Sequence, residues 1–339
     1  MITRIEPIGA TSLREAKDII FSGGVVAIPT ETVYGLGGDA LNDEAVKKIF
    51  EIKGRPNDNP LIAHVHPDFD LSAIIDYDPP YAALLRKAFL PGPLTLVYPS
   101  SGKVSPRVSC GLNTLAVRVP SHKGAQAFLR AVNIPVVAPS ANLSRHVSPT
   151  SARHVYDDFN GKIPLILDGG ECTGGIESTV ADVTGEYPVI LRPGLITREM
   201  IESVCGRCDV YAPELKAGEK PKSPGMMYKH YSPRCITYLF DENGGAAARR
   251  TANREAEQGR RVYFLCERSV ADVLRAEGEN VLDLGESESE MAANLFALLR
   301  KAETVADVLI AIEPKKKDGV MAGVLNRLRK ACASKDIPH

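Results

Sequence analysis

Two cations stand close together in the segment Lys53-Gly54-Arg55, and the residues that follow, up to Pro60, are rich in proline, asparagine and aspartate. This composition predicts a loop, and the apolar stretch 61–65 predicts a strand that would hold the loop rigidly. Because arginine offers a bidentate fork and lysine a point charge, such a loop beside a sheet can clamp a polyphosphate. A solvated basic turn is the alternative that these residues leave open.

Other polar clusters also follow predicted strands. Segment 29–37 comes after the apolar stretch 25–28 and combines hydroxyls, a carboxylate and glycines, although a capped turn with Glu31 on the surface fits as well. Ser140 and Asn142 come after the apolar stretch 134–138, and Arg192 ends a further one. Ligands of α/β proteins bind where strands end, so these clusters are candidates for one binding site.

Two more positions carry open alternatives. Arg118 lies inside the apolar stretch 115–119, and a buried arginine needs a partner, either a structural acid or a ligand carboxylate. Ser148 and Thr150 precede a predicted helix, where they could bind an anion or simply cap the helix.

Signatures of several other chemistries are missing from the sequence. It contains no G-x-x-x-x-G-K-[ST], G-x-S-x-G or H-E-x-x-H motif, and no dense acidic cluster that would build a metal site. His64 and His66 flank one strand residue and share a face, for which one polar contact to a ligand is a better interpretation than a metal. We therefore expect no metal held by the protein; if ATP is used, Mg²⁺ would be bound mostly by its phosphates and water.

Composition indicates an ordinary globular protein of two domains. The chain has 339 residues, 44% of them apolar and 24% charged, with a net charge of -1, so it lacks the overall basic signature of a nucleic-acid-binding protein. Apolar runs stay below the roughly 18 residues of a membrane span, and residues 1–7 show no signal-peptide pattern. Seven scattered cysteines favour reduced thiols, and we expect a cytoplasmic protein without membrane contact.

The elements that must position these residues fall into two α/β regions. In residues 1–204, strands are predicted at 25–28, 61–65, 94–98, 115–119, 136–138, 165–167, 179–183 and 189–191, and helices near 11–23, 42–51, 79–89, 122–131, 151–158 and 197–204. So many strands with fewer helices predict one large, twisted, mixed sheet.

The rest of the chain reads as a linker and a second domain. Residues 205–233 are polar and rich in helix breakers, and the tyrosines, lysine and histidine of 223–233 predict a lid that folds over a site. In residues 234–339, strands are predicted at 236–240, 261–265, 281–284 and 307–312, and helices near 245–257, 269–277, 288–301 and 319–331. This alternation predicts a small Rossmann-like, doubly wound α/β domain.

Six motifs occur together in a recognisable order. They are Pro29-Thr-Glu-Thr-Val-Tyr-Gly35, Lys53-Gly-Arg55 with Asn59-Pro-Leu61, Pro91-Gly-Pro-Leu-Thr95, Ala138-Pro-Ser-Ala-Asn142, Ser178-Thr179 and Leu191-Arg-Pro-Gly194. The set resembles the YrdC-like domain of threonylcarbamoyl-AMP synthases, and the linker with the C-terminal domain resembles the longer, two-domain form of that family. The resemblance covers nearly the whole chain.

The resemblance implies an activity and a set of site residues. The family makes L-threonylcarbamoyladenylate and pyrophosphate from L-threonine, bicarbonate and ATP, and a separate transferase passes the threonylcarbamoyl group to tRNA next to the anticodon. By resemblance, the catalytic set is Lys53, Arg55, Ser140 and Asn142. The nucleotide set is Arg55, Asn59, Thr114, Ser140, Ser148, Arg192, His230 and Tyr231, and the threonine set is Thr32, His64, Arg118, Ala138 and Ser178.

The chain departs from the family pattern in two places. Arg145-His146 replaces small residues after Ser144, and Met227 stands where a basic residue is common in the linker. Two alternatives remain beside the synthase: a protein that binds double-stranded RNA or tRNA, and a carbamoyl-transfer enzyme of hydrogenase maturation. A docking or regulatory role of the C-terminal domain, without chemistry, is expected alongside the synthase activity. A weak contact with tRNA is compatible with the synthase as well.

Overall fold

The computed structural model describes residues 1–211 and 231–332, and they form two compact units. Of the described residues, 1–144 and 148–211 belong to the first unit, and 145–147 and 231–332 belong to the second. The predicted lid residues Tyr228 and His230, and the variant position Met227, lie outside the described residues. The boundaries of the predicted linker therefore stay a prediction.

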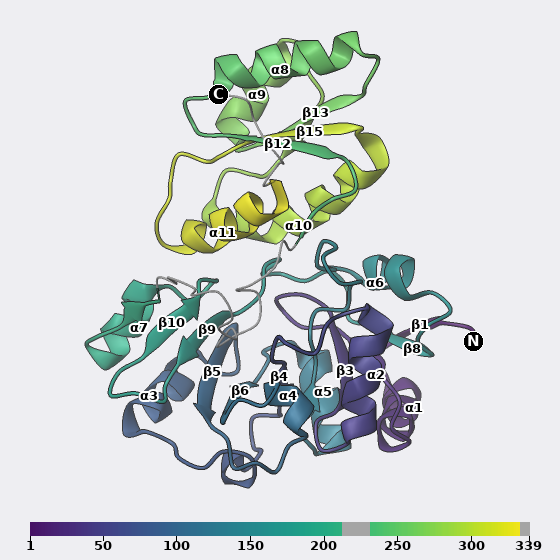
Figure 1. Cartoon of the computed structure of the whole chain (residues 1–339), viewed down its shortest axis with the longest axis vertical. Helices are drawn as coiled ribbons and strands as arrows, with labels where there is room; N and C mark the ends of the chain where they lie inside the picture. Colours follow the sequence, from purple (N-terminus) through teal and green to yellow (C-terminus); the bar gives the residue numbers. More distant parts are fainter. Residues whose placement is uncertain (212–230, 333–339) are drawn as a thin grey trace. The chain divides into compact units, whose positions relative to one another are not determined.

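The first unit is built on a mixed sheet, which among the described residues has eleven strands (Figure 1). The strands are β1 (Arg4–Pro7), β2 (Val26–Ile28), β3 (Gly35–Asp39), β4 (Ile62–His64), β5 (Leu94–Pro99), β6 (Thr114–Arg118), β7 (Val136–Val137), β8 (Leu165–Asp168), β9 (Thr179–Asp182), β10 (Val189–Arg192) and β11 (Asp209–Val210). Their order across the sheet is β1-β8-β2-β3-β7-β4-β6-β5-β9-β10-β11.

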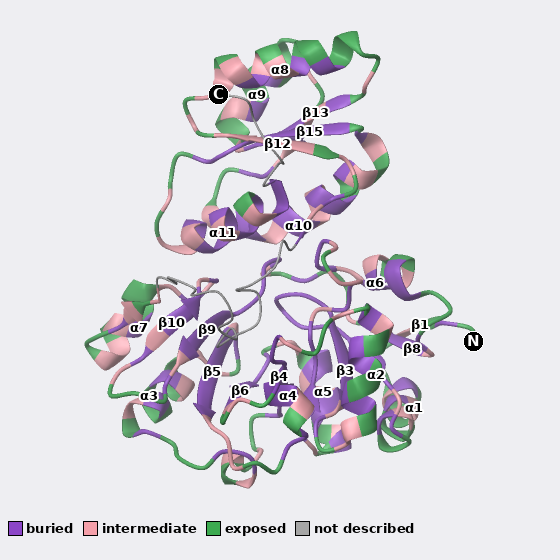
Figure 2. Cartoon of the chain, viewed as in Figure 1, coloured by how far each residue is buried: buried purple, intermediate pink, exposed green. Residues whose placement is uncertain are grey.

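Helices pack against both faces of this sheet. Figure 2 accordingly colours most of its strands as buried. The helices are α1 (Ala10–Phe21), α2 (Asp43–Lys53), the 3₁₀ turn η1 (Leu71–Ala73), α3 (Pro80–Phe89), α4 (Pro106–Ser109), α5 (Lys123–Val132), α6 (Ala152–Phe159) and α7 (Arg198–Cys205). Val26 and Ile28 pack with α1 and α5, while Ala27 packs with α2 and α6 on the other face. This alternation is the period of two expected of a strand buried on both sides.

The second unit carries a four-stranded parallel sheet. Its strands are β12 (Ile236–Phe240), β13 (Val262–Cys266), β14 (Val281–Asp283) and β15 (Val308–Ile312), in the order β12-β15-β13-β14. Its helices are α8 (Gly245–Glu257), α9 (Arg268–Ala276), α10 (Glu288–Val305) and α11 (Val320–Cys332), with α8 and α9 on one face and α10 and α11 on the other (Figure 1). The predicted fold class, a mixed-sheet domain followed by a doubly wound domain, is confirmed.

Three strands of the first unit escaped prediction: β1, β3 and the two-residue β11, which falls in the predicted linker. Strand β3 is the glycine-rich segment Gly35–Asp39, whose sequence lacks the β-branched residues that mark a strand. Its glycines are needed for close packing, because a Cβ on Gly35 would lie 2.9 Å from the Cβ of Ala138. Strand β1 was missed because it is short, polar and largely exposed.

Candidate functional site

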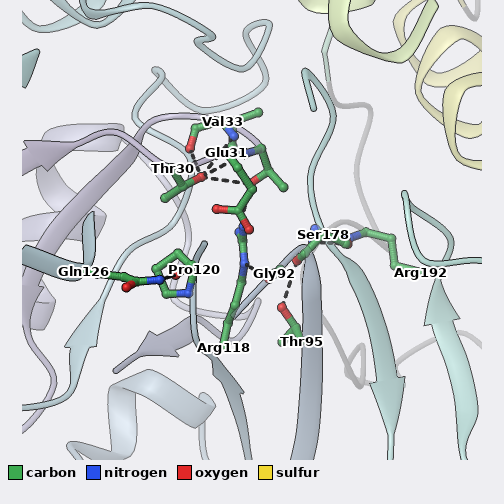
Figure 3. A network of polar contacts seen from close by, with 11 residues as sticks. Thr30, Glu31, Val33, Gly92, Thr95, Arg118, Pro120, Gln126, Ser178 and Arg192 are labelled. Carbon is green, nitrogen blue, oxygen red and sulfur yellow. Dashed lines mark hydrogen bonds and ion pairs between the residues drawn. The ribbon is translucent and has the colours of Figure 1, made fainter. Parts of the chain in front are cut away.

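A buried ion pair lies where β2 and β6 end. Arg118 is the last residue of β6, and its side chain is only 4% exposed. Its NH2 lies 2.6 Å from Oε1 of Glu31, its NH1 donates to Oγ1 of Thr32 at 2.8 Å, and its Nε donates to the carbonyl of Gly92 at 3.3 Å (Figure 3). Of the two partners that the sequence left open, the structure supplies the structural acid.

Glu31 is the site residue that the sequence interpretation missed. A glutamate on the surface of a turn was one expectation, and it was wrong, because the side chain is 11% exposed. Burial alone would raise the pKa of this carboxyl, but the Arg118 guanidinium and the backbone N–H groups of Glu31 and Ser121 together hold the pKa below its ordinary value. The signal that could have found it is the need of a buried arginine for an acid.

His64 lies beside this pair in an uncharged form. It ends β4 and is paired in register with Arg118 on β6. Its Nδ1 is 3.2 Å from the carbonyl of Ile62. Burial, assisted by the positive charge of Arg118, lowers the pKa of His64 to about 3, so the imidazole is neutral at physiological pH.

A second cluster joins Arg192, predicted for the nucleotide, with Ser178, predicted for threonine. Arg192, at the end of β10, donates from Nε and NH2 to the carbonyl of Ser178 at 3.2 and 3.0 Å and from NH2 to its Oγ at 3.2 Å. The Oγ of Ser178 also bonds Oγ1 of Thr95 at 2.8 Å (Figure 3). Thr95 is the register partner of Arg118 on β5, so the two clusters adjoin through neighbouring strands.

Lys53 lies at the end of a helix, not on the predicted loop. Helix α2 runs through Lys53 and ends at Gly54, whose left-handed φ of 58° terminates it. The Lys53 side chain is buried, and Nζ donates to the carbonyls of Ser140 and Asn142 at 2.5 and 2.6 Å. Three members of the predicted catalytic set are thus in contact, although through the backbone oxygens of Ser140 and Asn142.

The surroundings of Lys53 disfavour the charged form of its side chain. Burial, followed by repulsion from Arg55, lowers its pKa well below the ordinary value, while Asp158 acts in the opposite direction. Arg55 itself lies in the loop, where it donates to the carbonyl of Asn59 at 2.8 Å and lies 5.9 Å from the ring of Phe50. Arg55 is therefore close enough to Lys53 for the two charges to repel each other, and an anion bound beside them would relieve that repulsion.

Ser148 does not begin the following helix. The N-cap of α6 is Ser151, whose hydroxyl accepts from the N–H of His154 at 3.3 Å. Ser148 is fully buried, and its hydroxyl donates to Oε1 of Glu177 at 2.7 Å. Of the two alternatives, the helix cap is therefore wrong for Ser148, because Ser151 holds the cap, and a nucleotide contact of Ser148 stays a prediction.

The other predicted residues are placed as follows. Ala138 follows β7 and donates its N–H to the carbonyl of Ile62 at 3.1 Å, beside the threonine set. Thr114 begins β6, at the opposite end from Arg118, about 13 Å away along the strand. Tyr231 is buried in the second unit against Phe296, with ring centroids 5.1 Å apart. Arg145, one of the variant positions, also belongs to the second unit and has a φ of 73°.

The described residues show few features of a metal site or a membrane segment. Within residues 1–211 and 231–332, no group of three or more histidine, cysteine or acidic side chains is placed to hold a metal ion. None of the helices described there is long and apolar enough to cross a membrane. A cavity of about 740 Å³ is lined by residues such as His66, Phe69, Tyr77 and Arg86, and it includes none of the predicted site residues.

The sheet, its strand-end cluster and the appended parallel domain define a two-domain protein of the YrdC-like class. A family model of Sua5, YciO and YrdC proteins, described as telomere recombination, matches residues 18–194. A second model, described as the C-terminal domain of threonylcarbamoyl-AMP synthase, matches residues 196–333. The chain belongs to the threonylcarbamoyl-AMP synthase family, and it is an enzyme of the nucleotidyltransferase type.

Relatives match over nearly their whole length. The threonylcarbamoyl-AMP synthase of Pyrococcus abyssi is 43% identical over 331 residues, which are 96% of this chain and 95% of the relative. That of Bacillus subtilis is 41% identical over 327 residues, 96% and 94% of the two chains. The crystal structure of P. abyssi Sua5 complexed with L-threonine has a TM-score of 0.88 and 40% identity, and the match covers 98% of this chain and 97% of that one.

Proposed function

We propose that this chain forms L-threonylcarbamoyladenylate and pyrophosphate from L-threonine, bicarbonate and ATP. The observation that carries the proposal is the position of Arg118, a buried guanidinium bonded to the Thr32 hydroxyl and adjoining Ser178 and Arg192. Such a guanidinium suits the carboxylate of an amino acid. The structure of P. abyssi Sua5 complexed with L-threonine supports this choice of substrate.

The proposed reaction has two steps. The ammonium group of L-threonine first loses a proton; the resulting amine then attacks the carbon of bicarbonate, and loss of water gives the carbamate. A carbamate oxygen then attacks the α-phosphorus of ATP and expels pyrophosphate. No protein nucleophile is needed, so catalysis would consist of positioning and of stabilising phosphate charge.

In this proposal, one group of residues binds ATP and another binds L-threonine. Lys53 and Arg55 face the phosphates, and Arg192 and Ser148 contact the nucleotide side. Thr32, His64, Arg118 and Ser178 hold L-threonine, with His64 as a neutral hydrogen-bonding group. Mg²⁺ enters as the magnesium complex of ATP, held by phosphate oxygens and water. The product would pass to a separate transferase that modifies tRNA next to the anticodon.

Pyrophosphate release tests this proposal. Purified protein receives ATP, Mg²⁺ and bicarbonate, with L-threonine, with L-serine or without an amino acid. We expect release that depends on L-threonine and that Lys53→Ala and Arg55→Ala abolish, while Lys48→Ala on the same helix leaves it unchanged. Folded protein that releases no pyrophosphate under any of these conditions would refute the proposal and favour an RNA-binding role.

A further inference from the structure

Glu31 and Arg118 form an ion pair that leaves hydrogen-bonding capacity unused on both sides. Oε1 of Glu31 and NH2 of Arg118 are 2.6 Å apart, but the contact is not aligned as a hydrogen bond. Neither oxygen of Glu31 makes a well-aligned hydrogen bond to any residue of the two described ranges, and neither does NH2 of Arg118. The backbone N–H groups of Glu31 and Ser121 lower the pKa of the carboxyl, yet they do not reach such geometry.

This arrangement is unusual for a pair that serves only to balance charge. A structural arginine–carboxylate pair usually makes two parallel hydrogen bonds, which satisfy both partners. Buried polar atoms are ordinarily hydrogen-bonded, because water is no longer available to them. A pair with one contact and unused atoms on each member is suited to receive a further molecule.

Two titratable neighbours of the pair are uncharged. His64 on β4 and Cys172 after β8 both feel the charges of Glu31 and Arg118. Burial lowers the pKa of His64 to about 3 and raises the pKa of Cys172 to about 12, so both are neutral at physiological pH. One cation and one anion remain side by side in a dry environment.

A zwitterionic α-amino acid is the matching ligand. It carries a carboxylate and an ammonium group on the same carbon, so a neighbouring cation and anion can bind both at once. We propose that Glu31 binds the ammonium group of L-threonine while Arg118 binds its carboxylate, which makes Glu31 the residue that selects amino acids over hydroxy acids. This inference rests on the proposed function, and it adds a residue outside the threonine set given by the family resemblance.

The test compares two ligands that differ in the amine. Isothermal titration gives the Kd of L-threonine and of (R)-3-hydroxybutanoate, which keeps the carboxylate and the hydroxyl but lacks the amine. Wild-type protein should bind L-threonine at least tenfold more tightly. Glu31→Gln should weaken L-threonine binding at least tenfold and change the Kd of (R)-3-hydroxybutanoate by less than threefold or tighten it, because Arg118 loses its competing anion.

Two control variants make the result decisive. Glu31→Asp keeps a carboxylate and should keep the preference for L-threonine, and Glu171→Gln, an exposed neighbour, should leave both Kd values unchanged. Equal changes for both ligands in Glu31→Gln would overturn the inference, since a counterion acting only through Arg118 affects both carboxylates alike. If Glu31→Gln does not fold, equal affinity of wild-type protein for the two ligands would overturn it.

Failure of this inference can be told from failure of the proposed function. Threonine-dependent pyrophosphate release by wild-type protein, together with an unchanged ligand preference in Glu31→Gln, would overturn only the role of Glu31. Absence of both threonine binding and threonine-dependent release in wild-type protein would overturn both.

Discussion

Removing Arg118 while keeping Glu31 should destabilise the first unit strongly. In Arg118→Met the methionine replaces the apolar stem, but the Glu31 carboxylate stays buried without its cation. Unit charges 2.6 Å apart attract by at most about 6 kcal/mol at an effective dielectric constant of about 20. Because part of this attraction offsets desolvation, we expect a loss of about 3–5 kcal/mol, the usual cost of breaking a buried pair from one side.

Thermal unfolding measures this loss. For a unit of this size, a loss of about 3–5 kcal/mol corresponds to a Tm lower by about 6–20 °C at pH 7. The double variant Arg118→Met with Glu31→Gln removes both charges of this pair, so it should regain at least about half of the lost free energy. The coupling between the two substitutions should exceed about 1 kcal/mol.

The penalty should also depend on pH. Arg118 holds the pKa of Glu31 below its ordinary value of 4.5, so in the wild type the pair stabilises above pH 4.5 and is lost as the pH falls below it. In Arg118→Met, burial raises the pKa of Glu31 instead, and protonation at low pH relieves the variant. The difference in Tm between wild type and variant should therefore shrink as the pH falls through about 4.5. Additive substitutions and a difference that is constant from pH 7 to pH 4 would show that the pair is not the cause.

Three further predictions concern other buried groups. Lys53→Met should lower kcat/KM for ATP at least about 100-fold in the pyrophosphate assay, whereas Lys48→Met should not; equal activities would show that Lys53 faces no phosphate. The pKa of His64, lowered to about 3, predicts NMR signals of this ring that stay constant from pH 5 to 8, and an inflection near pH 6.5 would contradict its burial as a neutral group. Arg300→Ala should destabilise the second unit by about 1.5–3 kcal/mol in thermal unfolding, because the buried carbonyl of Val147 loses its 2.6 Å hydrogen bond from the guanidinium. Substitution of the exposed neighbour, Lys301→Ala, should have no effect, and equal Tm values for the two variants would refute this prediction.

The sequence was informative where periodicity and burial act locally. The strands of the second unit are continuous apolar runs, and the structure places each within a residue or two of its predicted position. Arg118 in an apolar strand predicted a partner, because burying an unpaired charge costs too much free energy. In both cases the requirements of burial determine the types of residues that are close together in the chain, so they can be recognised in the sequence.

Prediction failed where contacts between distant segments determine the surroundings of a residue. Glu31 reads as a surface residue until β6 brings Arg118 to it. Lys53 reads as part of a basic loop, because nothing near it in sequence shows that its ammonium would reach the carbonyls of Ser140 and Asn142. Strand β3 reads as a glycine loop, since the close packing that requires its glycines comes from residues about a hundred positions later.

The most direct test of the proposed synthase activity follows the carbon of bicarbonate. The protein is incubated with ATP, Mg²⁺, L-threonine and ¹³C-labelled bicarbonate, and the adenylate product is analysed by mass spectrometry. We expect one adenylate that contains both threonine and the labelled carbon and that disappears when any one of the three substrates is omitted. An adenylate of threonine without the label, or pyrophosphate release that needs no threonine, would contradict the proposed function.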